Sequence, residues 1–301
     1  MNRPEIQIEH LTKDYGHGRG VFDISIALQQ GECYGFLGPN GAGKTTTIRH
    51  LMGFSKPDSG RTFIQGKDCW DCSADLKHRV GYLPGEIALP SGITGEGFLK
   101  MTLRMHHADD VFCRQLLDRF QLDANKKTRE MSLGEKRKLA IVAAFMHDPE
   151  ILILDEPTSG LDPVMQQEFI NFVREEKERG KTIFMSSHIF REVDSVCERI
   201  AIIKSGRIVS EFLAEELKQT QDMIYALRFG TDSDYRLFKS KGYRLTADSE
   251  ERLKVKVSIP SSQLNAFVAD ISAMNVESFH QVQFSLEDYF MEFYKSEEAA
   301  L

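Results

Sequence analysis

The chain has 301 residues, of which 41% are hydrophobic, and a formal net charge of −7 with an isoelectric point near 5.8. This length suits one large domain and a smaller one, and the acidic balance argues against a broad surface for nucleic acid or anionic lipid. The longest apolar run, Ala140 to Met146, is too short to cross a bilayer, and residues 1–5 lack the apolar stretch of a signal peptide. We therefore expect a soluble, intracellular protein.

The first predicted elements are two strands, residues 6–10 and 21–28, separated by a glycine-rich loop from Thr12 to Gly20. Tyr15 lies in this loop, ahead of a phosphate-binding motif. A loop tyrosine alone more often packs, but stacking on a nucleotide base is worth about 1–3 kcal/mol and tolerates any base. The motif that follows favours the stacking role for Tyr15.

That motif is Gly38-Pro39-Asn40-Gly41-Ala42-Gly43-Lys44-Thr45, which matches the G-x-x-x-x-G-K-[ST] phosphate loop. Its glycines let successive backbone N–H groups point at a polyphosphate, and Lys44 adds positive charge for the β- and γ-phosphates. The Thr45 hydroxyl can hold Mg²⁺. Residues 32–37 read as a buried strand, and Thr46 opens a helix that runs to Met52 before Gly53 stops it. Strand, loop and helix therefore follow in the required order.

Two more strands are predicted at residues 61–64 and 80–83, and a helical insertion follows from Gly85 to about Glu130. Its apolar residues form two amphipathic patterns, at 98–105 and 111–120. We expect them to be local core, and docking of part of them on a partner is the alternative. Cys69 and Cys72 have C-x-x-C spacing without the second pair that a zinc site needs. A redox pair is the alternative, but we favour incidental surface cysteines.

A strong helix is predicted to run from Ser132 to about His147. Ser132 and Glu135 fit a capping box, in which each side chain satisfies the other residue's backbone N–H. Most such matches are only helix starts. Here the basic residues Lys136, Arg137 and Lys138 follow at once, so this helix N-terminus is well suited to an anion.

The next strand, residues 151–154, is continuously apolar and ends in Asp155 and Glu156. A helix (164–179), a strand (182–185), His188, a helix (190–197) and a strand (200–203) follow, which predicts an α/β fold with a mostly parallel sheet. Adjacent side chains at a strand end diverge, so Asp155 can face Mg²⁺ while Glu156 faces a water as general base. His188 is the expected contact to the γ-phosphate, although a lone histidine before a helix is usually structural.

The pattern changes after about Leu217 to β-α-β-β-α-β, the order of a small α+β, ferredoxin-like unit. Its elements are predicted at residues 223–229, 235–240, 243–247, 253–259, 261–274 and 279–284. A last helix would carry a packing stripe, formed by Leu286, Tyr289, Phe290 and Phe293. We find no catalytic chemistry in this unit.

With these motifs in place, residues 5 to about 217 resemble the ATPase subunit of an ATP-binding cassette (ABC) transporter. The resemblance rests on the phosphate loop 38–45, the signature-like Ser132-Leu133-Gly134-Glu135, Asp155-Glu156, the loop 159–162 and His188. It implies a P-loop NTPase cassette at residues 1–218 with a helical subdomain at about 86–146, and an accessory or regulatory domain at 219–301.

The same resemblance implies the function and the partners. ATP with Mg²⁺ would be bound and hydrolysed between two cassettes, of a homodimer or heterodimer, with Ser132 and Gly134 touching the nucleotide of the partner subunit and Tyr15 stacking on adenine. The chain would serve a separate membrane-spanning permease, from the cytoplasmic side of the cell membrane and without nucleic acid. The variant signature and the C-terminal extension are similar to bacterial exporters.

Two departures from the family pattern bear on the site. Met131, Leu133 and Glu135 replace members of the usual Leu-Ser-Gly-Gly-Gln signature, and the glutamine expected after Pro84 is Gly85, so Glu86 is the candidate substitute. The alternatives are a soluble ABC protein acting on nucleic acid or ribosomes, a GTPase or kinase, and a catalytically silent regulator. A single cassette counts against the soluble ABC protein. The motifs of a GTPase or a kinase are absent, and the intact Lys44 and Glu156 count against a silent regulator.

Overall fold

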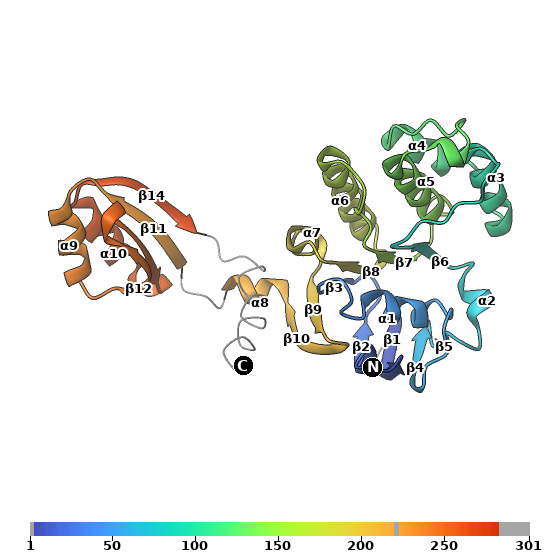
Figure 1. The fold of residues 1–301 in the computed structure, drawn as a ribbon, viewed down its shortest axis with the longest axis horizontal. Helices are drawn as coiled ribbons and strands as arrows, with labels where there is room; N and C mark the ends of the chain where they lie inside the picture. Colours follow the sequence, from blue (N-terminus) through green and yellow to red (C-terminus); the bar gives the residue numbers. More distant parts are fainter. Residues whose placement is uncertain (1–2, 220–222, 283–301) are drawn as a thin grey trace. The chain divides into compact units, whose positions relative to one another are not determined.

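The structure is a computed structural model that describes residues 3–219 and 223–282. The chain divides into two compact units, residues 1–214 and residues 215–301. Each unit is described by itself below, and Figure 1 labels the helices and strands of both.

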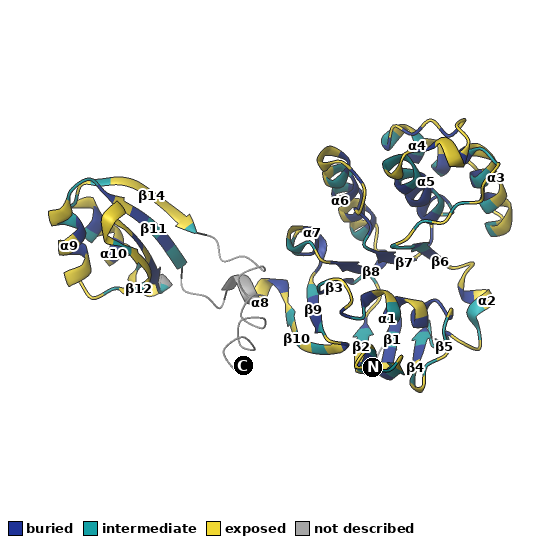
Figure 2. Ribbon diagram, viewed as in Figure 1, coloured by how far each residue is buried: buried dark blue, intermediate teal, exposed yellow. Residues whose placement is uncertain are grey.

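A six-stranded sheet forms the centre of the first unit. Its order is β10 (Arg207–Leu213), β9 (Arg199–Lys204), β3 (Cys33–Leu37), β8 (Thr182–Ser187), β7 (Ile151–Asp155) and β6 (Val80–Leu83). β10 pairs antiparallel with β9, and the other neighbouring strands are parallel. Three neighbouring inner strands, β3, β8 and β7, are buried along their whole length, because both faces of the sheet are covered; Figure 2 shows them in dark blue. The expected mostly parallel sheet is confirmed.

Helices α5 (Leu133–Phe145), α6 (Pro163–Glu178) and α7 (Phe190–Val196) lie on one side of this sheet in Figure 1. α1 (Lys44–Leu51) lies on the other side, together with a second sheet whose pairings are all antiparallel. That sheet has the order β2 (Gly20–Leu28), β1 (Ile6–Asp14), β4 (Ser59–Ile64) and β5 (Lys67–Asp68). One apolar core joins the two sheets through residues such as Ile8, Ile48 and Ile153. This packing fixes the carboxyl ends of β3, β7 and β8, where the phosphate loop and the acidic residues begin.

The helical insertion contains α3 (Gly95–His106) and α4 (Val111–Arg119), which both contact α5. A short helix, α2 (Ser73–Leu76), precedes it, and a 3₁₀ turn (Thr128–Glu130) leads from it into α5. The insertion is confirmed, but not every apolar residue in it is core. Met101, Met105 and Val111 are exposed, because the buried stripe consists of residues such as Leu99, Leu103 and Leu116.

The second unit begins within α8 (Ala214–Gln219), at Glu215, and contains a four-stranded sheet with two helices. The strands are β11 (Met223–Phe229), β12 (Arg244–Ser249), β13 (Lys254–Ile259) and β14 (Val276–Val282), and the helices are α9 (Asp232–Ser240) and α10 (Leu264–Ser272). Two 3₁₀ turns (Glu250–Arg252 and Ser261–Gln263) complete it. The spatial order β12-β13-β11-β14, antiparallel throughout, agrees with the predicted ferredoxin-like unit. Its core combines alternate strand residues with Phe238 and Phe267 from the helices.

Several local predictions need correction. β1 continues to Asp14, so the first loop is shorter than predicted, because residues 11–14 pair with β2. The edge strand β10 was not predicted, since its alternating pattern follows directly on a turn. The strand predicted at residues 253–259 begins one residue later, at Lys254, because Leu253 has a left-handed φ of 49°. Cys69 is fully buried rather than a surface residue, and burial raises the pKa of its thiol to about 12. The predicted helix at Leu286–Phe293 lies outside the described residues.

Candidate functional site

The phosphate loop connects β3 to the N-terminus of α1. Gly43 caps the helix with a φ of 114°, and a Cβ there would lie 2.7 Å from Val21 Cγ1, so only glycine fits. The Gly38 N–H donates to the Ser187 carbonyl (3.2 Å), which joins the loop to the end of β8. The loop is therefore held in place from both sides, with the positive end of the α1 dipole directed at it.

Lys44 is almost completely buried, with 5% of its surface exposed. Its Nζ donates to the carbonyls of Gly38 (2.6 Å) and Pro39 (3.0 Å), and forms an ion pair with Glu156 Oε1 at 2.9 Å. A buried ammonium needs such partners, because desolvation penalises an unpaired charge. The contacts place the lysine charge inside the loop and against the acidic end of β7.

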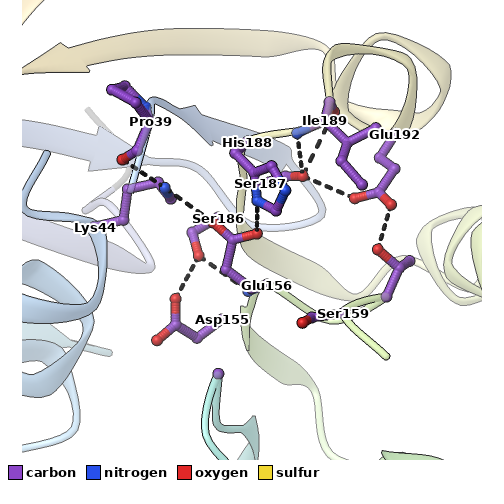
Figure 3. A network of polar contacts seen from close by, with 12 residues as sticks. Pro39, Lys44, Asp155, Glu156, Ser159, Ser186, Ser187, His188, Ile189 and Glu192 are labelled. Carbon is purple, nitrogen blue, oxygen red and sulfur yellow. Dashed lines mark hydrogen bonds and ion pairs between the residues drawn. The ribbon is translucent and has the colours of Figure 1, made fainter. Parts of the chain in front are cut away.

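The Glu156 carboxylate contacts two other predicted site residues, Lys44 and His188. Its Oε2 lies 2.5 Å from His188 Nδ1, opposite the oxygen that pairs with Lys44, as Figure 3 shows. The Glu156 backbone has a left-handed φ of 47°, a conformation that costs a non-glycine residue about 1–3 kcal/mol. Hydrogen bonds from its N–H to the carbonyl and hydroxyl of Ser186 (3.1 and 3.2 Å) stabilise it. This conformation directs the carboxylate away from Asp155 and toward the phosphate loop.

Asp155 has no exposed surface, and burial raises the pKa of its carboxyl group. Oδ1 accepts a hydrogen bond from Ser186 Oγ (2.6 Å), and the carboxylate also interacts with the Thr45 hydroxyl. Among the residues that the structure describes, Oδ2 has no hydrogen-bond partner. A buried, unpaired carboxylate oxygen beside a hydroxyl is the donor set that Mg²⁺ prefers. The residues present therefore fit a magnesium ion.

Glu192 of α7 connects the segments that follow β7 and β8. Its buried carboxylate accepts hydrogen bonds from the Thr158 hydroxyl and from Ser187 Oγ (2.8 Å). Burial raises the pKa of Glu192. Thr158 lies two residues beyond Glu156, and Ser187 immediately precedes His188, so Glu192 is hydrogen-bonded to both of the segments that carry these site residues. Figure 3 shows its bond to Ser187 beside His188.

Two cavities bring most of the predicted site residues together. A cavity of about 320 Å³ is lined by Tyr15, Arg19, Gly20, Asn40, Gly41, Gly43, Lys44, Thr45, Thr46 and Glu156. A second, of about 650 Å³, shares Asn40, Thr45 and Glu156 with the first and adds Asp155, His188 and Glu86. Tyr15 is 55% exposed at the edge of the first cavity, so its ring is available for stacking. Gly38, Pro39 and Ala42 line neither cavity, and the first two instead bind Lys44.

Ser132 and Gly134 lie away from both cavities, at the start of α5. The predicted capping box is present: Ser132 Oγ accepts from the Glu135 N–H (3.2 Å), and the Glu135 carboxylate accepts from the Ser132 N–H (2.9 Å). Glu135 also pairs with Lys126 at 2.6 Å. Leu133 is 64% exposed beside them. The serine-led helix start therefore faces outward instead of toward the phosphate loop of its own chain.

The sequence did not point to three polar residues of the site, namely Thr158, Ser186 and Glu192. Arg137 was predicted to contribute to an anion site but is 2% exposed and turned inward. The only local signal for the other three was their nearness in sequence to Glu156 and His188.

The chain is similar in sequence and in fold to known proteins. The family model described as ABC transporter matches residues 21–159. The bacitracin transport ATP-binding protein BcrA of Bacillus licheniformis is 36% identical over 218 residues, covering 71% of each chain. The daunorubicin resistance ATP-binding protein DrrA3 of Streptomyces coeruleorubidus is 35% identical, over 71% of this chain and 69% of that protein. A solved ATP-binding subunit of an ABC transporter aligns with a TM-score of 0.64 at 25% identity, over 82% of this chain and 97% of the other.

A helix that spans a membrane must be long and predominantly apolar. Across residues 3–219 and 223–282, no helix combines the length and the apolar character that spanning a bilayer requires.

Proposed function

The chain belongs to the ABC transporter family as one of its ATP-binding and ATP-hydrolysing subunits, and from this premise we propose how its residues divide the reaction. The observation that carries the proposal is the Glu156 carboxylate, held between Lys44 at 2.9 Å and His188 at 2.5 Å. Glu156 lines both cavities, Lys44 lines the first and His188 the second, which supports the roles of base, phosphate-binding cation and polar contact for these three residues.

ATP binds with its phosphates in the loop 38–45 and its base at Tyr15. Both residues that define this orientation, Tyr15 and Lys44, line the cavity of about 320 Å³. Backbone N–H groups of the loop and the N-terminus of α1 bind the phosphate oxygens, and Lys44 neutralises the β- and γ-phosphates. The Thr46 N–H extends this cradle into the first turn of the helix.

Mg²⁺ would be held by the Thr45 hydroxyl and by Asp155, whose Oδ2 is otherwise unpaired. When bound, the ion neutralises charge on the β- and γ-phosphates. Glu86, which lines the cavity of about 650 Å³ together with Thr45 and Asp155, takes the place of the glutamine that the family pattern has at Gly85. Ser186 fixes the Asp155 carboxylate so that the unpaired oxygen faces the cavity.

Glu156 acts as the general base. Its carboxylate orients the attacking water and accepts its proton, and its strained backbone keeps the group at one position. His188 holds Glu156 through Nδ1 and contributes a contact to the γ-phosphate. Because Lys44 pairs with the same carboxylate, the base and the phosphate-binding cation occupy fixed positions relative to each other.

The second half of the site comes from another copy of the chain. Ser132 is exposed and its hydroxyl oxygen accepts the capping bond, so the O–H can still donate to a phosphate. Gly134 leaves room for close approach, and α5 presents its positive end. Two copies arranged head to tail would place this helix start over the nucleotide of the neighbouring subunit.

The cassette serves an exporter, because its relatives are named for bacitracin transport and daunorubicin resistance. These names favour export over the alternative of a soluble ABC protein working on nucleic acid or ribosomes. A separate membrane-spanning permease carries the substrate, and the cassette acts at the inner face of the cell membrane. The second unit provides dimer contact or regulation.

Purification with the membrane proteins of its own cell tests this proposal. The chain should co-purify with a multi-spanning membrane protein and hydrolyse ATP in a magnesium-dependent way, and His188→Ala should reduce turnover while leaving nucleotide affinity similar. Co-purification with ribosomes or nucleic acid, or full activity after chelation of Mg²⁺, would contradict it.

A further inference from the structure

Arg137 lies in the second turn of α5, five residues beyond the capping serine, and points inward. Only 2% of its surface is exposed, although arginine is rarely buried to this extent. Burial lowers the pKa of its guanidinium group, and the carboxylates of Asp155 and Glu156 offset part of this effect. Keeping the Arg137 charge in the interior therefore costs desolvation free energy, and the contacts of the guanidinium group indicate its role.

Those contacts join three segments that are distant in sequence. Nε donates to the Ser159 carbonyl (2.8 Å), Nη1 to the Pro84 carbonyl (2.8 Å) and Nη2 to the Gly85 carbonyl (2.6 Å). Ser159 belongs to the loop after Glu156, whereas Pro84 and Gly85 belong to the loop after β6. A planar guanidinium donates in fixed directions, so one side chain sets the separation of both loops from α5.

Both loops border the carboxylates of the proposed reaction. Pro84, Gly85 and Ser159 line the cavity that contains Asp155, Glu156 and His188. Gly85 lies so close to Asp155 that a Cβ on it would come 3.1 Å from Oδ2. A shift of the Gly85 backbone would therefore move atoms directly against the carboxylate oxygen assigned to Mg²⁺.

We propose that Arg137 is a positioning residue, which links the helix that carries Ser132 to the two loops that border the hydrolytic carboxylates of the same subunit. This inference rests on the function proposed above. A displacement of α5, such as a neighbouring nucleotide binding at Ser132 would cause, is transmitted by Arg137 to the loops at Gly85 and Ser159 together. The alternative is an arginine that only stabilises the fold.

Two substitutions separate these roles. Arg137→Lys keeps the charge but has one donor nitrogen in place of the three-point fork, and Arg137→Met keeps much of the volume without the donors. Arg114→Lys is the matched control, because Arg114 is an exposed arginine of α4 whose contact is an ion pair with Asp110 at 3.1 Å. Each variant is purified as the full chain, and magnesium-dependent ATP hydrolysis is measured with thermal unfolding.

We expect kcat to fall about tenfold or more in both Arg137 variants, with KM for Mg-ATP within about threefold, since misplacement by about 1 Å can cost about a hundredfold. Arg137→Lys should retain this defect at temperatures where it is fully folded. Unchanged kcat in a folded Arg137→Lys variant, or a loss equal to that of Arg114→Lys, would overturn the inference.

A third variant covers the case in which the Arg137 variants do not fold. Gly85→Ala places a methyl group beside Asp155 Oδ2 without removing Arg137, and it should lower kcat by about tenfold and raise the magnesium concentration needed for half-maximal activity. Wild-type kinetics in Gly85→Ala would overturn the link between this loop and the carboxylate. An inactive wild-type chain would instead contradict the proposed function itself.

Discussion

Glu192 allows the support of the site to be tested apart from its chemistry. Its carboxylate is 6% exposed and accepts hydrogen bonds from Thr158 and Ser187, which adjoin the segments of Glu156 and His188. Glu192→Ala would remove the carboxylate acceptor of two buried hydroxyl groups and leave the Ser187 hydroxyl only a long contact with the Ile189 carbonyl (3.5 Å). Each such loss costs about 1–3 kcal/mol, and because burial already penalises the native carboxylate, we expect a total near 3 kcal/mol.

This loss is measurable in two ways. For a unit of this size, 1 kcal/mol corresponds to about 2–4 °C in Tm, so Tm of the first unit should fall by about 6–12 °C. The fluorescence of Trp70, the single tryptophan of the chain, reports on that unit. At a temperature where the variant is folded, kcat should fall by about tenfold to a hundredfold because Glu156 and His188 lose a common support. The Kd for Mg-ATP should stay within about threefold, since the phosphate loop is untouched.

Glu178→Ala, at an exposed position of α6, is the matched control and should change neither quantity. Glu192→Gln should lie between wild type and Glu192→Ala, because the amide retains one acceptor oxygen. A Glu192→Ala variant that loses the expected stability but keeps kcat within threefold of wild type would refute the positioning argument.

The other predictions concern nucleotide affinity and pH. Tyr15→Ala should weaken Mg-ATP binding by about 1–3 kcal/mol while Tyr15→Phe stays near wild type, and equal affinity of all three in a calorimetric titration would exclude base stacking. Lys44→Ala should weaken the same affinity at least about tenfold, because a charge-assisted contact to phosphate is lost, and an unchanged Kd would be inconsistent with its assigned role. Burial, then His106 and Lys181, lower the pKa of His147 from 6.5 to about 4, so the unfolded chain binds a proton that the folded chain does not between these values. The free energy of unfolding should fall as pH falls from 6.5 to 4, by about 1–2 kcal/mol after solvent screening. His147→Phe should remove this pH-dependent loss of stability, which denaturation at pH 7.5 and pH 5 measures. An identical pH dependence in the variant would show that His147 does not cause the loss.

Local pattern was enough to predict the parts of the site that are continuous in sequence. The phosphate loop, the Ser132 cap and the acidic end of β7 each depend on residues within eight positions of one another, and the glycine, charge and spacing requirements are visible there. The strand–helix alternation likewise predicts the parallel sheet, because a parallel neighbour requires a crossover connection.

Contacts between distant segments could not be predicted in this way. Arg137 and Gly85 are 52 positions apart, and Glu192 and Thr158 are 34 apart, so neither pair has a local signal. Arg137 stands between two lysines in a basic run that was expected to suit an anion at the helix start, and only helix packing shows that it turns inward. The burial of Cys69 has the same origin, since its position beneath Gly53 depends on how α1 meets the segment after β5.

The central claim is that two copies of the chain enclose ATP between the Lys44 loop of one and the Ser132 helix start of the other, with Glu156 as base. The most direct test is the molar mass of Glu156→Gln in Mg-ATP, measured by light scattering during size-exclusion chromatography and combined with counting of bound nucleotide. The account predicts a stable dimer that retains two unhydrolysed ATP molecules and dissociates when Ser132 is replaced by a bulky residue. A variant that binds ATP yet remains monomeric, or that hydrolyses it at the wild-type rate, would contradict the claim.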